Sequence, residues 1–212
     1  MKIAPEGHLF IIPLFIAAVG TLVGAWILNA DMSLGILIVA LLLFCLNFFR
    51  DPVRQCTGDK NSIVSPADGK IIRIAEVNDL DVGPESKFIS IFLNIFNVHT
   101  NRMPITGQFQ NVNYKPGKFL AAFDHRASDD NEQTEILIDT KYGPVKVKQI
   151  AGFIARRILC YAQKNLPMNQ GDRLGFIRFG SRTDLIVPKS VTLQVKIGQK
   201  VIGTETVIGN FE

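Results

Sequence analysis

A glycine–serine pair near the C-terminal end carries the most distinctive chemistry in the sequence. In Phe179-Gly180-Ser181-Arg182, the serine hydroxyl could attack the preceding glycine carbonyl and shift the acyl group from nitrogen to oxygen. Elimination of the ester would leave dehydroalanine, which hydrolyses to a pyruvoyl group with loss of ammonia. Glycine favours this reaction because it tolerates strained backbone and lets the oxygen approach closely. The reaction also needs a base and donors for the oxyanion. The alternative is an ordinary turn between two strands.

Few side chains could supply the base. The sequence has three histidines, and His8 lies at the start of an apolar run, which leaves His99 and His125 as candidates. A lone histidine is more often packed or solvated than catalytic. The sequence has no GxxxxGK(S/T), HExxH or GxSxG motif and no Cys/His cluster of metal-ligand spacing, so we expect no metal. Its three cysteines form no CxxC pair, which fits reduced thiols in a cytoplasm.

Six short segments, in this order and spacing, resemble one known family. They are 48–52 (FFRDP), 65–70 (SPADGK), 97–104 (NVHTNRMP), 131–132 (NE), 171–173 (GDR) and 178–182 (RFGSR). Together, behind an apolar N-terminal region, they resemble the short bacterial form of the phosphatidylserine decarboxylase proenzyme family. The resemblance covers essentially the whole chain.

The resemblance implies a pyruvoyl-dependent carboxy-lyase that activates itself. The proenzyme would cleave between Gly180 and Ser181 into a β chain of residues 1–180 and an α chain of residues 181–212, which stay associated. The pyruvoyl group made from Ser181 would form a Schiff base with the amine of phosphatidylserine. It would then accept the electron pair released with carbon dioxide, and the product would be phosphatidylethanolamine. No metal or dissociable cofactor is implied.

The resemblance also implies roles for individual residues. Asp68, His99 and Ser181 match the self-cleavage triad of the family. The longer branch of the family has two histidines three residues apart, and Arg102 stands here at the second position. His99 therefore serves both self-cleavage and decarboxylation, or another residue does one of them. Arg102 and Arg182 are candidates for binding the substrate carboxylate or phosphate. The alternative for Asp68 is a turn carboxylate that bonds its own backbone.

Charge divides the chain into an anchor and a domain. Residues 1–50 hold four charges and residues 51–212 hold the other 38, with a net charge of +4 overall. The apolar run 9–28 is long enough to cross a bilayer, and the run 34–49, extended to 32, is shorter. We therefore predict a transmembrane helical hairpin (9–28 and 32–49) in a membrane anchor, residues 1–50, followed by a catalytic domain, residues 51–212.

The domain reads as mainly β. Short apolar and β-branched runs alternate with turn signals at 69–74, 88–93, 135–138, 145–150, 176–179, 184–187 and 192–196. We expect a sandwich or barrel-sandwich-like domain with few short helices, one of them at 154–161.

The location and the partners follow from the anchor and the substrate. Basic residues flank the hairpin and its loop has none, which puts both ends in the cytoplasm at the inner (plasma) membrane of a bacterium. The phospholipid in the bilayer is then the expected partner, and scattered basic residues disfavour nucleic acid. A homodimer is compatible with the sequence. The alternative functions are the same chemistry on archaetidylserine and a non-enzymatic membrane-anchored adaptor or carrier.

Overall fold

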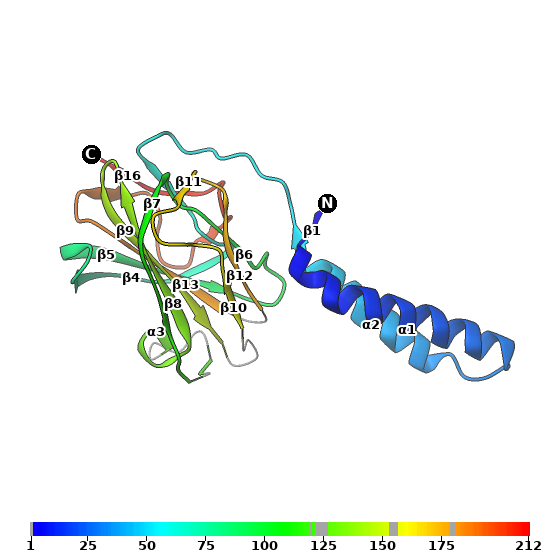
Figure 1. The fold of residues 1–212 in the computed structure, drawn as a ribbon. Coiled ribbons are helices and arrows are strands. Elements are labelled where there is room, and N and C mark those ends of the chain that lie inside the picture. The colour runs from blue at the N-terminus through cyan, green and yellow to red at the C-terminus, as the bar shows by residue number, and fades with distance from the viewer. Residues whose placement is uncertain (1, 119, 122–126, 153–156, 179–180) are drawn as a thin grey trace. The chain divides into compact units, whose positions relative to one another are not determined.

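The computed structural model describes residues 2–118, 120–121, 127–152, 157–178 and 181–212, drawn as a coloured ribbon in Figure 1. Contacts between residues divide the chain into two compact units, Met1–Val53 and Arg54–Glu212. Each unit is described by itself below.

The first unit is a helical hairpin closed by two short strands. Its elements are β1 (Lys2–Ile3), the 3-10 turn η1 (Pro5–Gly7), α1 (His8–Ile27), α2 (Ser33–Phe48) and β2 (Arg50–Asp51), and β1 pairs with β2. The helices approach closely at Gly35, where an added Cβ would lie 2.4 Å from Leu22 Cδ2. Both helices end within one residue of the predicted limits.

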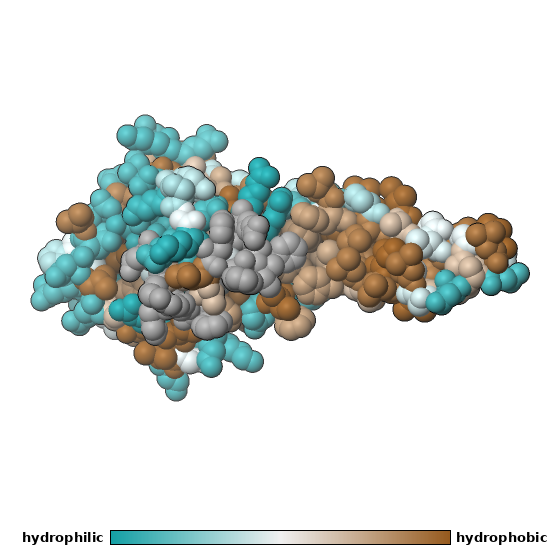
Figure 2. Space-filling view, turned by 90° about the horizontal axis from the view of Figure 1, so that it is seen from below, coloured by the Kyte–Doolittle hydropathy of each residue, from teal (hydrophilic) through white to brown (hydrophobic). Residues whose placement is uncertain are grey.

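The surface of this hairpin is apolar, as the brown colour in Figure 2 shows. Among the described residues, one helical stretch, Pro5–Ile27, is long and apolar enough to cross a membrane, with a mean hydropathy of 2.3. Helix α2 has 16 residues and is shorter than a typical span. The exposed apolar side chains of α1 and α2 must be covered by something other than water.

The second unit is mainly β, as predicted. Its largest sheet has the strand order β11-β7-β8-β9-β13-β5-β4-β15, and all neighbouring pairs are antiparallel. These strands are β4 (Gly69–Asp79), β5 (Gly83–Leu93), β7 (Gly107–Lys115), β8 (Gln133–Thr140), β9 (Gly143–Ala151), β11 (Pro167–Met168), β13 (Ser181–Val187) and β15 (Lys200–Val201).

Two three-stranded sheets and one short helix complete this unit. One sheet joins β10 (Ile158–Cys160), β12 (Arg173–Ile177) and β6 (Thr100–Arg102), and the other joins β14 (Val191–Leu193), β16 (Val207–Phe211) and β3 (Ser62–Val64). Helix α3 (Ala127–Asp130) follows the described residues 120–121 after a gap.

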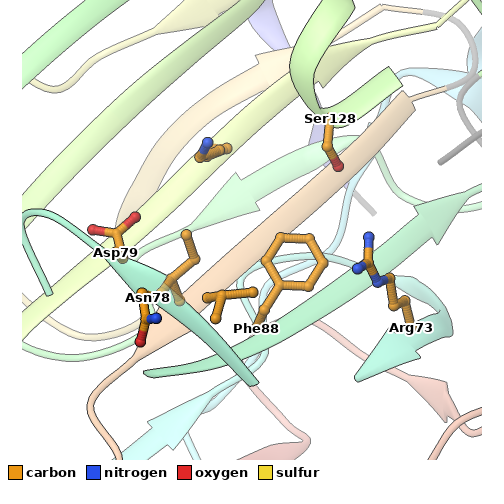
Figure 3. A pocket seen from close by; sticks show the side chains of 8 residues that line it. Arg73, Asn78, Asp79, Phe88 and Ser128 are labelled. Atoms are coloured by element: carbon orange, nitrogen blue, oxygen red, sulfur yellow. The ribbon is translucent and has the colours of Figure 1, made fainter. Parts of the chain in front are cut away.

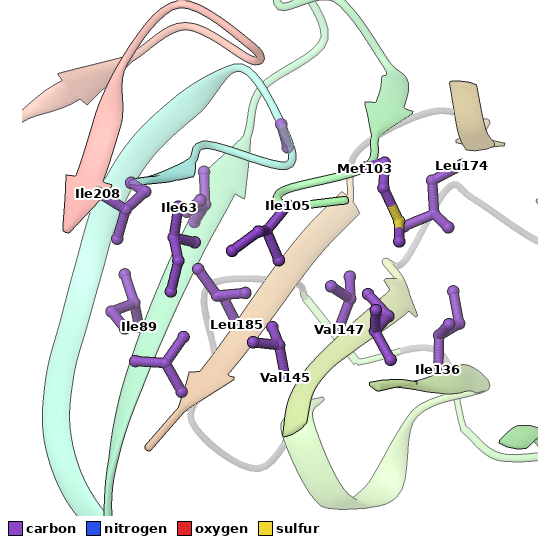
Figure 4. Close-up of a cluster of buried hydrophobic side chains, with 14 of the residues drawn as sticks. Ile63, Ile89, Met103, Ile105, Ile136, Val145, Val147, Leu174, Leu185 and Ile208 are labelled. Carbon is purple, nitrogen blue, oxygen red and sulfur yellow. The ribbon is translucent and has the colours of Figure 1, made fainter. Parts of the chain in front are cut away.

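One hydrophobic core lies between the large sheet and the smaller ones. Figure 4 shows Leu185 of β13, Ile89 of β5 and Val147 of β9 pointing toward Ile63 and Met103 from the other side. Because side chains alternate along a strand, Leu185 and Val187 place the odd-numbered residues of β13 on the core side. The even-numbered residues of β13 lie on the outer face of the large sheet.

The structure corrects three element boundaries. The helix expected at 154–161 is wrong for its described part, because Ile158–Cys160 pair with β12 as strand β10. The strand expected at 192–196 ends at Leu193, before the turn that contains Gly198. The strand expected at 176–179 is described only as far as Ile177, and Phe179 lies outside the described residues.

Candidate active site

Ser181 is the first residue of β13 and lies in the middle of the large sheet. It pairs with Leu93 of β5 on one side and with Ala151 of β9 on the other. The residue is 0% exposed, and its Oγ has no hydrogen-bond partner among the described residues. A buried hydroxyl without a partner is costly, so this position favours a chemical role over a structural one. Gly180 lies outside the described residues.

His99 lies directly before β6 and is fully buried as well. Its Nδ1 is 3.0 Å from the carbonyl oxygen of Asn97. A carbonyl oxygen only accepts hydrogen bonds, so Nδ1 is the donor in this contact. In the neutral ring Nε2 then carries the lone pair, which is the form that a general base requires.

A buried amide joins the strand of His99 to the strand of Ser181. Asn101 Nδ2 donates to Thr183 Oγ1 at 3.1 Å, and Gln149 Nε2 donates to Asn101 Oδ1 at 2.7 Å. Asn101 lies two residues after His99, and Thr183 lies two residues after Ser181. Side chains two residues apart on extended backbone point to the same side. His99 therefore points the same way as Asn101, and Ser181 the same way as Thr183, so both point toward the space that the Asn101–Thr183 hydrogen bond crosses.

The segment 65–70 lies against the same strand. Arg102 N donates to Pro66 O at 2.8 Å, and Arg102 pairs with Arg173 of β12. Met103 N donates to Asp172 O, also at 2.8 Å. The motifs at 65–70, 97–104 and 171–173 therefore meet around β6, although they are far apart in the sequence.

The motif at 131–132 reaches the strand next to Ser181. Asn131 Nδ2 donates to the carbonyl oxygen of Ala151 at 2.7 Å, and Ala151 pairs with Ser181. The backbone N–H of Ala151 donates to Glu132 O at 2.9 Å. Asn131 thus supports the end of β9 at the level of the candidate nucleophile.

Asp68 forms its bonds with residues outside its own turn. Arg54 Nη2 donates to Asp68 Oδ2 at 2.7 Å, and Arg54 Nη1 also contacts Oδ1. The backbone N–H of Gly203 donates to the same Oδ1 at 2.8 Å. The side chains of Arg54 and Asp68 are only 10% and 11% exposed. The carboxylate of Asp68 therefore fixes its turn to two segments that are distant in the sequence, one at Arg54 and one at Gly203. Its contact with His99 or Ser181 stays a prediction.

The two arginines proposed to bind substrate have different surroundings. Arg102 is half-buried and its Nη1 donates to Gly171 O at 3.3 Å. Arg182 is an even-numbered residue of β13, so its side chain lies on the sheet face opposite to that of Ser181. It is 0% exposed, and its Nε donates to Asp184 Oδ1 at 2.7 Å. Arg182 therefore lies on the side of the sheet opposite to Ser181, and its role in substrate binding stays a prediction.

The described residues contain no group of three His, Cys, Asp or Glu side chains that could hold a metal ion. His125 lies outside these residues. The Ser181 hydroxyl follows a glycine in the sequence and has no hydrogen-bond partner among the described residues. These features fit a pyruvoyl group made from Ser181.

Sequence reasoning missed Arg54, Gln149 and Thr183. Arg54 is one of the basic residues that flank the apolar region, and Gln149 and Thr183 are uncharged polar residues next to charged ones in β9 and β13. A buried polar residue in a strand needs a partner, and that was the available signal. Gly175 also escaped notice: an added Cβ there would lie 2.5 Å from Gln149 Nε2, so β12 needs glycine to pass this layer.

Comparison with known proteins gives a consistent result. The family model described as phosphatidylserine decarboxylase matches residues 41–209. The chain is similar to proteins named phosphatidylserine decarboxylase proenzyme from three bacteria. It is 46% identical to that of Chlorobium limicola over 82% of both chains. It is 40% identical to that of Chlorobaculum tepidum over 99% of this chain and 98% of the other. It is 42% identical to that of a Wolbachia species over 99% of this chain and 91% of the other.

Proposed function

The chain belongs to the phosphatidylserine decarboxylase family, and we propose that it converts phosphatidylserine to phosphatidylethanolamine after cutting itself between Gly180 and Ser181. The observation that carries the proposal is the Ser181 hydroxyl, which is buried without a partner among the described residues. Of the five other sequence motifs, three (65–70, 97–104 and 171–173) meet around β6, which Asn101 joins to the strand of Ser181, and one (131–132) bonds to the neighbouring strand β9.

Self-cleavage uses the residues of this chain alone. His99 takes the proton from Ser181 Oγ, which attacks the Gly180 carbonyl carbon; a C–O bond forms, the C–N bond breaks and the nitrogen gains a proton. Loss of the Ser181 α-proton then expels the Gly180 carboxylate. The remaining dehydroalanine tautomerises and hydrolyses, which releases ammonia and leaves the pyruvoyl group. Burial excludes water from the ester, which would otherwise hydrolyse to an unmodified serine.

The pairing of β13 explains why the two fragments would stay together. After the cut, β13 would begin the α chain, while β5 and β9 belong to the β chain. The register joins Ser181–Val187 to β5 and six of these seven residues to β9. The α-chain strands β15 and β16 also pair with β4 and β3. Each fragment alone would expose unpaired strands and the core residues that the other fragment covers, so separation is unfavourable.

Decarboxylation needs an electron sink, a proton donor and a binding site for the head group. The pyruvoyl group supplies the sink for the electron pair that remains when carbon dioxide leaves. His99 in its imidazolium form, which takes its proton from solvent, can donate a proton to the substrate α-carbon. The guanidinium of Arg102 binds the anionic head group through its N–H donors. Arg54 holds the carboxylate of Asp68 in position through their ion pair.

The apolar hairpin suits a substrate that stays in the bilayer. Helix α1 belongs to the stretch that is long enough to span a membrane, and α2 follows it after a short loop that contains Asp31 but no basic residue. We place the hairpin in the inner membrane of a bacterium and the domain at the cytoplasmic face. Tethering raises the local concentration of the lipid head group around the domain.

Intact-mass spectrometry of the purified protein tests the proposal. The native chain should separate into residues 1–180 and a smaller fragment, 181–212, without a free amine. Ser181→Ala should stay a single chain and release no carbon dioxide from phosphatidylserine. Ser190→Ala, a change of an exposed serine in a turn, is the matched control and should behave like the native chain. A single uncut chain in an active preparation would contradict the proposal.

His99→Ala separates the two reactions assigned to that histidine. Fragment formation is followed by mass, and turnover is measured on whatever protein has been cleaved. We expect both to fall, while His8→Ala in the helical hairpin should leave both unchanged. Normal cleavage together with normal turnover in His99→Ala would remove this residue from the site.

A further inference from the structure

The outer face of the large sheet contains a cavity that the decarboxylation does not use. It has a volume of about 280 Å³ and lies on the face of β13 that carries the even-numbered residues, including Ile186. Figure 3 shows Arg73 and Ser128 at one end, Asn78 and Asp79 at the other, and Phe88 between them. Ser181 points to the opposite side of the same strand.

One end of the cavity carries the positive charge of Arg73, which has no ion pair with a carboxylate among the described residues. The Arg73 guanidinium lies 5.4 Å from the centre of the Phe88 ring. The nearest acidic residue in its cross-strand row, Asp184, is already bonded to Arg182 and to Ser128.

Lys148 lies in the same row and adds to the positive charge. The register places Arg73 opposite Ser90, Ser90 opposite Asp184 and Asp184 opposite Lys148. Lys148 Nζ is 2.8 Å from Glu135, but this carboxylate also pairs with Lys115 at 3.0 Å. Glu135 therefore serves two ammonium groups, and Arg73 and Lys148 are the two cationic side chains that line the cavity.

Ser90 supplies a second, independent observation. It is 0% exposed, and its hydroxyl has no hydrogen-bond partner among the residues that the structure describes. It lies between Arg73 and Asp184 in the row, on the side of the sheet that holds the cavity. Ser90 does not itself line the cavity, but a buried hydroxyl without a partner on this face, in register with Arg73, fits a polar site on this side of the sheet.

We propose that this cavity binds a small, soluble polyol phosphate, with the phosphate at Arg73 and the hydroxyl groups toward Asn78 and Asp79. A phosphate ester carries a charge close to −2 near neutral pH, which complements the positive charges of Arg73 and Lys148 in the lining. The other end offers an amide and a carboxylate, which bond to hydroxyl groups. A volume of about 280 Å³ accommodates a ligand of the size of glycerol 3-phosphate and is too small to enclose the acyl chains of a lipid.

Isothermal titration calorimetry on the full chain in detergent tests this site. The probes are glycerol 3-phosphate, inorganic phosphate and glycerol, all at the same ionic strength. We expect saturable binding of one glycerol 3-phosphate per chain, weaker binding of inorganic phosphate and no binding of glycerol. The uncut Ser181→Ala chain should bind equally well, because the cavity lies on the other face of β13; this result is independent of the decarboxylase activity.

Two variants connect the binding to Arg73. Arg73→Gln should weaken glycerol 3-phosphate binding about tenfold or more, as expected for the loss of a charged hydrogen bond, and Arg73→Lys should fall between this variant and the native chain. Lys196→Gln, which removes an exposed charge that does not line the cavity, is the control and should bind normally. Absence of saturable binding to the native chain, or equal affinity in a folded Arg73→Gln variant, would overturn the proposal.

Discussion

Replacing Asp184 by asparagine tests how firmly the strand of Ser181 is held from behind. Asp184 accepts hydrogen bonds from Arg182 Nε at 2.7 Å and from Ser128 Oγ at 2.8 Å, and the Arg182 and Asp184 side chains are both 0% exposed. Asparagine keeps the size and removes the charge, so the buried guanidinium loses its ion pair with Asp184. Breaking a buried pair in this way costs about 3–5 kcal/mol. In a domain of this size each kcal/mol lowers the melting temperature by about 2–4 °C, which predicts a fall of about 6–20 °C.

Two further variants calibrate this value. Ser128→Ala removes one hydrogen bond to the same carboxylate and should cost about 1.5–3 kcal/mol. Lys189→Gln breaks an ion pair with Glu85 that has the same 2.7 Å length, but these side chains are 66% and 64% exposed. Solvent screens such a pair, so this control should melt like the native chain. Thermal unfolding of the full chain in detergent, followed by the β-sheet signal in circular dichroism, gives the three melting temperatures.

The order of the three variants decides whether burial controls the strength of these pairs. If Asp184→Asn and Lys189→Gln have the same melting temperature, the argument that a buried ion pair contributes more to stability than an exposed one is refuted. Because β13 begins at Ser181, Asp184→Asn should also accumulate uncut chain, which intact-mass spectrometry detects. Complete cleavage in a strongly destabilised Asp184→Asn variant would show that the stability of β13 does not control self-cleavage at Ser181.

Three other predictions concern buried polar contacts. Asn101→Ala should slow self-cleavage in a time course of fragment formation, because β6 loses its amide bond to β13. Arg54→Gln should lower turnover with unchanged circular dichroism, because Asp68 loses its ion pair. Burial opposes ionisation of Asp79, but hydrogen bonds from Lys146 and the backbone outweigh it and lower the pKa of this carboxyl below its ordinary value of 3.8. Its stabilisation is present above that value and is lost as the pH falls through the folded-state pKa, so Asp79→Asn should melt lower at neutral pH and show a smaller acid-induced loss.

The residues that carry chemistry could be recognised without coordinates because their signals are local. Ser181 was singled out by the glycine before it, and the turn at 65–70 and the segment around His99 by their residue types and spacing. The two apolar helices were placed within one residue because an apolar run of that length has few alternatives. Strand ends were less certain, as Ile158–Cys160 shows, because short apolar segments suit a strand or a helix until a neighbour pairs with them.

The sequence by itself determined the membership in a decarboxylase family, the mainly β domain behind an apolar hairpin and the identity of the candidate nucleophile. Only the tertiary structure decided which groups oppose one another: that Asp68 binds Arg54 and Gly203, that Asn101 joins β6 to β13, and that Arg182 points away from Ser181. The physical reason is that alternation along a strand assigns a side chain to one of two faces. What lies across from that face depends on strand order and register between distant segments, which local patterns do not encode.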